Sequence, residues 1–259
     1  MTGRLQGKVA FITGAGSGIA RAAAHRFAQE GASVVLAELR PDLGASAADE
    51  VRAGGGDARF VPCDVTDQAS VTSAVAAAVE AYGGLHVLYN CAGGSLPEDG
   101  SVVDTDLDVW RRTLDLNLLG SMLCARSAFP WLVRSGAGSI INMSSITALQ
   151  GGVAGDMYSA TKGAVISLTR SLAARGSEHG VRANAIAPGT VLTERVTSRM
   201  GMSSPADPLP AVLRDFAAGH PMSVGSPDDI AAVALFLASD ESRMVTGALI
   251  PAEGGLSAF

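Results

Sequence analysis

Short apolar runs alternate with longer helical stretches along the whole chain, and this alternation sets the expected fold. Strand-like runs of four to six residues stand at 9–13, 33–37, 58–62, 86–89, 139–143, 182–187 and 248–251. Ala-rich stretches between them, at 19–29, 68–82, 157–175 and 227–238, are predicted to be helices. Apolar strands separated by helices indicate βαβ units, whose parallel strands are covered on both faces. Because such crossovers are right-handed, the pattern predicts an α/β fold with a Rossmann-type doubly wound sheet of about seven strands.

No repeat and no linker divides the chain, so residues 1–259 are expected to form a single domain. One stretch departs from the alternation. Residues 192–222 collect Met, Pro and Ser without strand character. A long excursion of this kind inside a compact domain is typical of a binding loop, and we expect it to be a lid over a substrate site.

Composition narrows the class of protein. With 47% hydrophobic and 17% charged residues, the chain can bury a large core. Its net charge of −6 and the lack of a Lys/Arg run argue against nucleic acid as a partner. The three widely spaced cysteines suggest reduced thiols in a cytoplasmic protein. The apolar run at 9–12 is too short for a signal peptide, and no run is long enough to cross a membrane, so a soluble protein is expected.

The first candidate site is the turn FITGAGSGIA at residues 11–20. In a doubly wound sheet this turn brings a pyrophosphate to a helix N-terminus, where free N–H groups favour an anion. Gly14 permits a sharp turn and Gly18 lets backbone approach the phosphates, although Ile19 stands where G-x-G-x-x-G needs glycine. Glu38 ends the second strand, twenty residues after Gly18, and can accept bonds from ribose hydroxyls.

The same carboxylate selects between two dinucleotides. In a partly solvated site, Glu38 would repel a 2′-phosphate at close range with an energy on the order of a few kcal/mol. We therefore favour NAD over NADP. Arg21 and Arg40 lie close enough in sequence to keep NADP use open.

The second candidate site is the pair Tyr158 and Lys162. The chain has 17 Arg but only two Lys, and only three Tyr, so a Tyr four residues before a Lys has a chance of about one in forty. On a helix this spacing puts both side chains on one face. A phenol with a pKa of roughly 10 is a poor base, and a neighbouring ammonium would stabilise the phenolate. Tyr158 could then exchange a proton with an alcohol.

Read as T-G-x-x-x-G-I from Thr13 to Ile19, with the Tyr158–Lys162 pair, the chain resembles the short-chain dehydrogenase/reductase family over residues 7–255. Ala20 replaces the last glycine of the family pattern, Cys91 replaces an Asn in YNCAGG, and Glu253 stands where Asp is usual. The resemblance implies that Ser145, thirteen residues before Tyr158, binds the substrate oxygen, with Ser144 as its rival. It also implies that Asn117 kinks its helix and carries a water chain to the lysine.

The resemblance further implies contacts with the cofactor. Asp64 and Val65 would border the adenine, and Val191 and Thr193 would lie against the nicotinamide. With the residues above, the expected catalytic set is Asn117, Ser145, Tyr158 and Lys162. The expected cofactor-binding set is Gly14, Ser17, Gly18, Ile19, Glu38, Asp64, Val65, Asn90, Ala92, Gly93, Tyr158, Lys162, Pro188, Val191 and Thr193. No metal site is expected, because the four histidines form no H-x-x-x-H pair.

These expectations predict a dinucleotide-binding and catalytic domain that oxidises a secondary alcohol with NAD, or reduces the ketone. The alternatives are a cofactor-binding sensor or scaffold without turnover, and an NADPH-dependent ketoreductase. The sequence contains no G-x-S-x-G motif, which a serine hydrolase would need, and no P-loop. A methyltransferase could share the glycine turn and the acidic strand end, but its reaction does not require Tyr158 and Lys162. Enoyl reductases of the same fold space Tyr and Lys more widely, and position 165 is Val.

The sequence leaves two classes of substrate open, a neutral molecule and a carboxylate. Apolar residues of the expected lid favour a neutral, cyclic or terpenoid molecule, but they could equally pack against neighbouring subunits: Met200, Met202, Leu209, Val212, Leu213, Phe216 and Met222. Arg195 or Arg199 could instead hold a carboxylate. Relatives in the family are commonly homotetramers joined through the helix with Tyr158, and an apolar stripe at four-residue spacing fits that assembly: Ala160, Ala164, Leu168 and Leu172.

Overall fold

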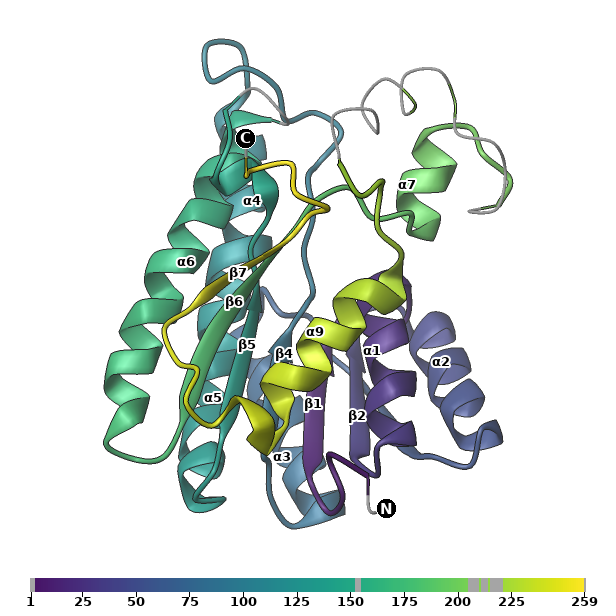
Figure 1. Cartoon of the computed structure of the whole chain (residues 1–259), viewed down its shortest axis with the longest axis vertical. Coiled ribbons are helices and arrows are strands. Elements are labelled where there is room, and N and C mark those ends of the chain that lie inside the picture. The colour runs from purple at the N-terminus through teal and green to yellow at the C-terminus, as the bar shows by residue number, and fades with distance from the viewer. Residues whose placement is uncertain (1–2, 152–154, 205–209, 211–213, 215–220, 259) are drawn as a thin grey trace.

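The computed structural model describes residues 3–151, 155–204, 210, 214 and 221–258. Seven strands form one parallel sheet in the order β3-β2-β1-β4-β5-β6-β7 (Figure 1). They are β1 (Val9–Thr13), β2 (Ser33–Glu38), β3 (Asp57–Pro62), β4 (Val87–Asn90), β5 (Ser139–Met143), β6 (Arg182–Pro188) and β7 (Leu249–Ala252). The predicted doubly wound sheet is confirmed.

Helices cover both faces of the sheet. They are α1 (Gly18–Gln29), α2 (Pro41–Ala53), α3 (Gln68–Tyr82), α4 (Leu107–Leu114), α5 (Gly120–Arg134), α6 (Asp156–Ser177), α7 (Glu194–Arg199) and α9 (Pro227–Ala238). Successive side chains of β1 point to opposite faces of the sheet and enter two separate hydrophobic cores. Ala10 and Ile12 pack with α1, α2 and α9, whereas Val9 and Phe11 pack with α3, α5 and α6.

Local sequence explains where the helices begin. The Asp67 side chain accepts the N–H groups of Ala69 and Ser70 at the start of α3. At the start of α9, Ser226 and Asp229 exchange hydrogen bonds as a capping box. These side chains satisfy N–H groups that have no partner within the helix.

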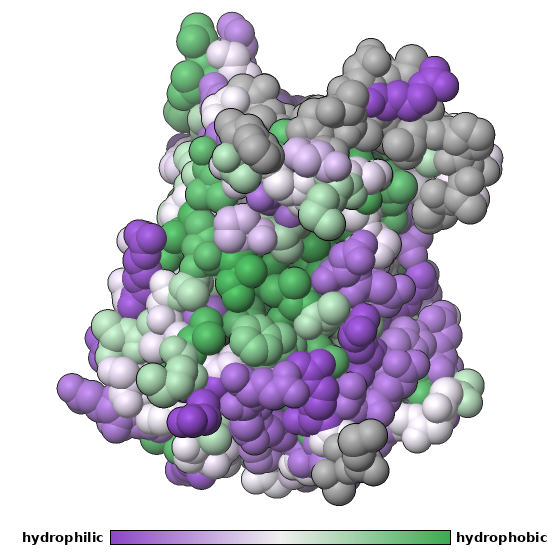
Figure 2. Space-filling model, in the orientation of Figure 1, coloured by the Kyte–Doolittle hydropathy of each residue, from purple (hydrophilic) through white to green (hydrophobic). Residues whose placement is uncertain are grey.

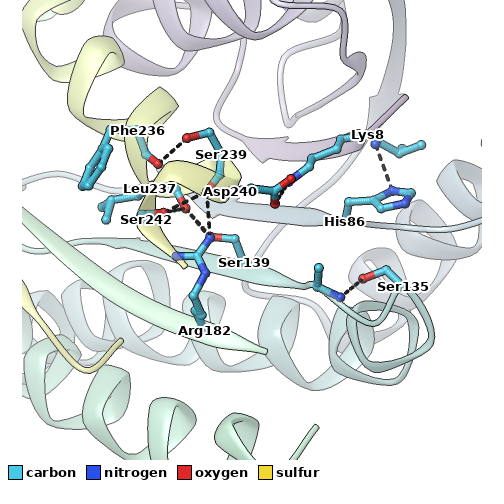
Figure 3. Close-up of polar contacts among 12 residues, drawn as sticks. Lys8, His86, Ser135, Ser139, Arg182, Phe236, Leu237, Ser239, Asp240 and Ser242 are labelled. Carbon is cyan, nitrogen blue, oxygen red and sulfur yellow. Dashed lines mark hydrogen bonds and ion pairs between the residues drawn. The ribbon is translucent and has the colours of Figure 1, made fainter. Parts of the chain in front are cut away.

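Polar contacts hold α9 to the amino-terminal edge of the sheet (Figure 3). The Arg182 guanidinium donates to the carbonyls of Leu237 (2.8 Å) and Ser239 (3.2 Å), which end α9. The hydroxyls of Ser139 and Ser242 also donate to the Leu237 carbonyl. A cation at a helix C-terminus is favourable, so this cluster fixes the end of α9 at the amino ends of the strands. The candidate site lies at the opposite, carboxyl ends of the strands.

His86 gives this edge a pH-dependent contact. Its Nδ1 accepts the Val9 N–H at 3.1 Å, which requires the neutral ring (Figure 3). Burial, and then the charge of Lys8, lower the pKa of His86 below its ordinary value. An unfolded chain, whose His has a pKa of about 6.5, binds the proton more readily. This contribution to stability is therefore complete above about pH 6.5 and is lost as the pH falls towards the lower folded pKa.

We expect the free energy of unfolding, measured by urea titration, to fall between pH 7.5 and pH 5.5 more steeply in the native chain than in His86→Asn. An Asn oxygen could keep the acceptor without titrating. His25→Asn is the control, because His25 lies on α1 and pairs with Glu50. An equal pH slope in His86→Asn and the native chain would contradict this assignment.

Candidate active site

A cleft of about 610 Å³ lies beside the turn that follows β1. The strand order reverses at β1, which lies between β2 and β4. The connections that follow β1 and β4 therefore run to opposite sides of the sheet and leave a crevice at the carboxyl ends of these strands. The backbone is tightly set, because a Cβ on Gly14 (φ 67°) would lie 2.9 Å from the Ala92 Cα. The Thr13 hydroxyl accepts the N–H groups of Cys91 (3.0 Å) and Ala92 (3.1 Å), joining the ends of β1 and β4.

Most of the predicted cofactor residues line this cleft: Gly14, Ser17, Gly18, Ile19, Glu38, Asp64, Val65, Ala92, Gly93 and Thr193. Pro188, Val191, Tyr158 and Lys162 line an adjoining cavity. Asn90 lines neither. It is buried, and its amide donates to the Ser121 carbonyl (3.2 Å) and to Asn142 Oδ1 (2.9 Å), so it braces β4 against β5.

Glu38 is held at the end of β2, with 6% of its side chain exposed. Its Oε2 accepts the Gly16 N–H at 3.0 Å, and its Oε1 accepts the Arg40 N–H at 3.1 Å and the Arg40 Nε at 3.4 Å. A carboxylate has about four acceptor positions, so capacity remains for about one hydroxyl group of a ligand in the cleft.

An acidic side chain that the sequence analysis missed reaches the start of α1. Glu194, the first residue of α7, accepts the Gly18 N–H through Oε2 at 3.0 Å and pairs with Arg21 through Oε1. It therefore lies where the helix N-terminus attracts an anion. The only available signal was an acid directly after Thr193, itself a predicted cofactor residue.

The adjoining cavity, of about 590 Å³, brings together three of the four predicted catalytic side chains, and Asn117 is buried behind it. Tyr158, Lys162, Ser144 and Ser145 line it. Ile19, Cys91, Gly93, Thr193 and Arg195 line both this cavity and the cleft, so the two spaces adjoin. A ligand that extends from the cleft into this cavity would therefore reach Tyr158 and Lys162.

The two serines have different partners. The Ser144 hydroxyl donates to the Lys162 carbonyl at 2.9 Å and so holds α6 against the end of β5. The Ser145 hydroxyl accepts the Thr147 N–H at 3.2 Å, and its side chain also hydrogen-bonds Tyr158. This arrangement favours Ser145 over Ser144 as the group beside the phenol.

Burial dominates the electrostatics of the pair. It raises the pKa of Tyr158, which the Ser145 hydrogen bond and the charge of Arg195 then lower in part. Burial lowers the pKa of Lys162 to about 8. The Lys162 Nζ lies over the Tyr158 ring, 5.5 Å from its centroid, and donates to the Met143 carbonyl at 2.8 Å. In the protein by itself, then, Ser145 and Arg195 assist the phenolate more directly than the expected ammonium does.

Asn117 lies in a π-helical turn, Asp115–Leu119, between α4 and α5. The expected irregularity of this helix is therefore present. The buried amide accepts the Gly94 N–H at 2.9 Å and donates to the carbonyls of Gly94 (3.2 Å) and Thr113 (3.0 Å). A Cβ on Gly93 would lie 2.6 Å from Asn117 Oδ1 and 3.3 Å from Lys162 Nζ, so Asn117 fixes the backbone that borders the lysine.

The described part of the expected lid is α7 and its flanks. The Arg195 guanidinium donates to the Gly93 carbonyl at 3.0 Å. Arg199 donates to the hydroxyl (3.1 Å) and the carbonyl (3.0 Å) of Ser95. Both arginines thus attach α7 to the turn after β4. Met200 lines the cavity, while Leu209, Val212, Leu213 and Phe216 lie outside the described residues.

Comparison with known proteins identifies the family. A family model described as enoyl-(acyl carrier protein) reductase matches residues 14–257. A 2,5-dichloro-2,5-cyclohexadiene-1,4-diol dehydrogenase of Sphingobium indicum is 43% identical over 260 residues and covers 99% of each chain. A solved short-chain type dehydrogenase/reductase from Mycobacterium ulcerans matches with a TM-score of 0.91 at 34% identity, over 98% of this chain and 91% of that chain. The chain belongs to the short-chain dehydrogenase/reductase family.

A further relative, a 2-(S)-hydroxypropyl-CoM dehydrogenase of Xanthobacter autotrophicus, is 37% identical over the full length of both chains. The chain is therefore an oxidoreductase of the short-chain dehydrogenase/reductase type, a family that uses nicotinamide cofactors. The cleft fits such a group. Its glycine backbone leaves no room for side chains, the α1 N-terminus faces it, and the Glu38 carboxylate lies beside Gly16 of the same turn.

Two further observations concern the described residues alone. No helix among them is long and apolar enough to cross a membrane. Within the same part of the chain, no three His, Cys, Asp or Glu side chains are placed to hold a metal ion.

Proposed function

We propose that the protein oxidises a secondary alcohol with NAD, or reduces the corresponding ketone, with Tyr158 as the acid/base. The observation that carries this proposal is the meeting of Tyr158, Ser145 and Lys162 in a cavity that opens onto the dinucleotide cleft. The matching family model carries the description of an enoyl reductase. The one-turn spacing of Tyr158 and Lys162 supports an alcohol dehydrogenase or ketoreductase instead, because enoyl reductases of this fold space the two residues more widely.

The chain's own residues divide the work. When bound, the nicotinamide dinucleotide supplies the hydride acceptor or donor. Ser145 donates a hydrogen bond to the substrate oxygen and so stabilises the charge that develops there. Tyr158 takes the hydroxyl proton of the alcohol, or returns it to the ketone.

Lys162 and Asn117 support this proton transfer. The Lys162 ammonium holds the nicotinamide ribose and adds positive charge beside the phenol. Asn117 keeps the Gly93–Gly94 backbone beside the lysine and forms part of a proton relay to it. The rest of the predicted cofactor set, including Asn90, contacts or braces the dinucleotide site.

The substrate proposed is a neutral ring alcohol. The cavity carries apolar side chains beside Tyr158, among them Met143, Ile146 and Met200. The relative from Sphingobium indicum, by its name, dehydrogenates a cyclohexadiene diol. A panel of cyclic and open-chain alcohols and ketones, followed at the nicotinamide absorbance with both coenzymes, tests this. Turnover of none of them would favour the sensor or scaffold, which binds dinucleotide without reaction.

The preference for NAD over NADP is proposed to rest on Glu38. In Glu38→Gln the affinity for NADPH relative to NADH should rise by about 10- to 100-fold, because a charge pair at about 4 Å contributes up to ~4 kcal/mol near a protein surface. Arg40, which now bonds Glu38, would be free to meet a 2′-phosphate. Dissociation constants from NADH and NADPH fluorescence measure the effect. Glu50→Gln on α2 is the control, and a native enzyme that already prefers NADPH would contradict the assignment.

We further propose a cytoplasmic homotetramer, with 1–259 as one domain and the segment at 192–222 as the substrate lid. Figure 2 supports an assembly surface, because hydrophobic side chains gather at the middle of the face that carries β7 and α9 in Figure 1. Among the residues of these two elements, Val233 and Phe236 of α9 and Leu249 and Ile250 of the edge strand β7 are half-buried. Light scattering after gel filtration reports the number of subunits.

A further inference from the structure

The helix that carries Tyr158 does not cap itself. Its N-cap residue is Gly155, which has no side chain to offer. The first three N–H groups of α6 are bonded instead by the loop between β4 and α4. The Asp156 N–H donates to the Gly100 carbonyl (2.9 Å), the Met157 N–H to Asp99 Oδ1 (3.2 Å) and the Tyr158 N–H to Asp99 Oδ2 (2.7 Å).

The fit between the loop and the helix is reciprocal. A Cβ on Gly155 would lie 2.2–2.6 Å from the Asp99 carboxyl group, so only glycine allows this approach. In return, the Val102 N–H donates to Asp156 Oδ2 at 2.8 Å. A carboxylate at the positive end of a 22-residue helix is favourable as a charge as well as an acceptor.

Tyr158 depends on this cap more than Lys162 does. Tyr158 is the third residue of α6, in the turn that frays first when its N–H groups lose their partners. Lys162 lies one turn further on and has its own attachment to the Met143 carbonyl. The place of the phenol relative to Ser145 therefore follows the first turn, and a displacement of about 1 Å can reduce turnover by about 10²-fold.

We propose that Asp99 is a positioning residue for Tyr158, an inference that rests on the proposed role of Tyr158 as acid/base. The loop that supplies it begins with Gly93, Gly94 and Ser95, which line the substrate cavity. One loop thus borders the substrate and fixes the residue that exchanges its proton.

The test is Asp99→Ala with Asp99→Asn. In Asp99→Ala, kcat for the best alcohol of the panel should fall about 10- to 100-fold, while the dissociation constant of NADH stays within about twofold. Asp99→Asn keeps one acceptor and should recover part of the loss. The amides of Met157 and Tyr158 should also exchange with D₂O faster in Asp99→Ala, which is measured by mass spectrometry without substrate.

Asp106→Ala is the matched control. Asp106 caps α4 by accepting the Asp108 N–H at 2.7 Å, so its loss should lower the melting temperature by a similar amount, about 2–4 °C. It should leave kcat and the exchange at the start of α6 unchanged. An equal fall of kcat in both variants would show a general loss of stability and overturn the proposal.

Tyr158→Phe in the same assays separates two failures. If Tyr158→Phe keeps its activity, the proposed function fails whatever Asp99→Ala does. If Tyr158→Phe is inactive but Asp99→Ala keeps the native kcat, only the role of Asp99 fails. Unchanged amide exchange in Asp99→Ala would overturn that role even for a chain that turns over none of the alcohols.

Discussion

Tyr158→Phe should bind NADH with an affinity within about threefold of the native value and turn over alcohol about 10³-fold more slowly. The change removes one oxygen from a half-buried ring that lines the cavity. General acid/base groups contribute about 10²–10⁴-fold to rate, and Tyr158 is the only phenol among the described residues that line the cavity. Stopped-flow binding of NADH and steady-state turnover of the best alcohol measure the two quantities.

Tyr82→Phe is its control. The Tyr82 hydroxyl lies on α3 and donates to Asp57 Oδ1 at 3.0 Å, away from both cavities. This variant loses a phenol oxygen of the same kind and should keep its turnover. Native-like activity in Tyr158→Phe would remove Tyr158 from the reaction.

Lys162→Met should weaken NADH binding and lower kcat/KM by about 10²-fold or more, because the ribose and the phenol lose the same ammonium. A second effect follows from the pKa of about 8 that burial gives this lysine. An unfolded lysine has a pKa of about 10.4, so between pH 8 and about 10 the unfolded chain binds more protons. The free energy of unfolding of the native chain therefore contains a part that rises with pH through this window.

That part should be missing in Lys162→Met, and urea titrations at pH 8 and pH 10 would show it as a shallower pH dependence. The only other lysine of the chain gives the control. Lys8 pairs with Asp240 at the opposite edge of the sheet, so Lys8→Met should change neither NADH binding nor turnover. If both variants show the same pH dependence as the native chain, Lys162 does not titrate in this window.

The fold followed from the sequence because the five inner strands, β2, β1, β4, β5 and β6, are buried on both faces and each is bounded by a helix or a turn. The predicted runs at 9–13 and 139–143 coincide with β1 and β5. The fourth strand was expected at 86–89 and spans Val87–Asn90. An apolar run locates a strand but does not mark its ends, because the ends depend on pairing with neighbouring strands that are distant in sequence.

The candidate site was predictable where its chemistry lies within one element. The four-residue spacing placed Tyr158 and Lys162 on one helix face, and both line one cavity. Contacts between distant segments were not predictable. Asp99 meets Tyr158 across 59 positions, and Glu194 meets Gly18 across 176, without a local pattern at either end. The raised pKa of Tyr158 likewise depends on burial, which spacing does not report.

The hydrogen bond between Glu194 and Gly18 bears on how tightly any dinucleotide can be held. The N-terminus of α1 already has a carboxylate, and Arg21 neutralises it. A diphosphate arriving there would substitute one negative group for another instead of filling a bare positive end. If the diphosphate of a dinucleotide takes that position, its free energy of association reflects only the difference between the two negative groups, and Glu194, tethered to α7, is the group that replaces it on release.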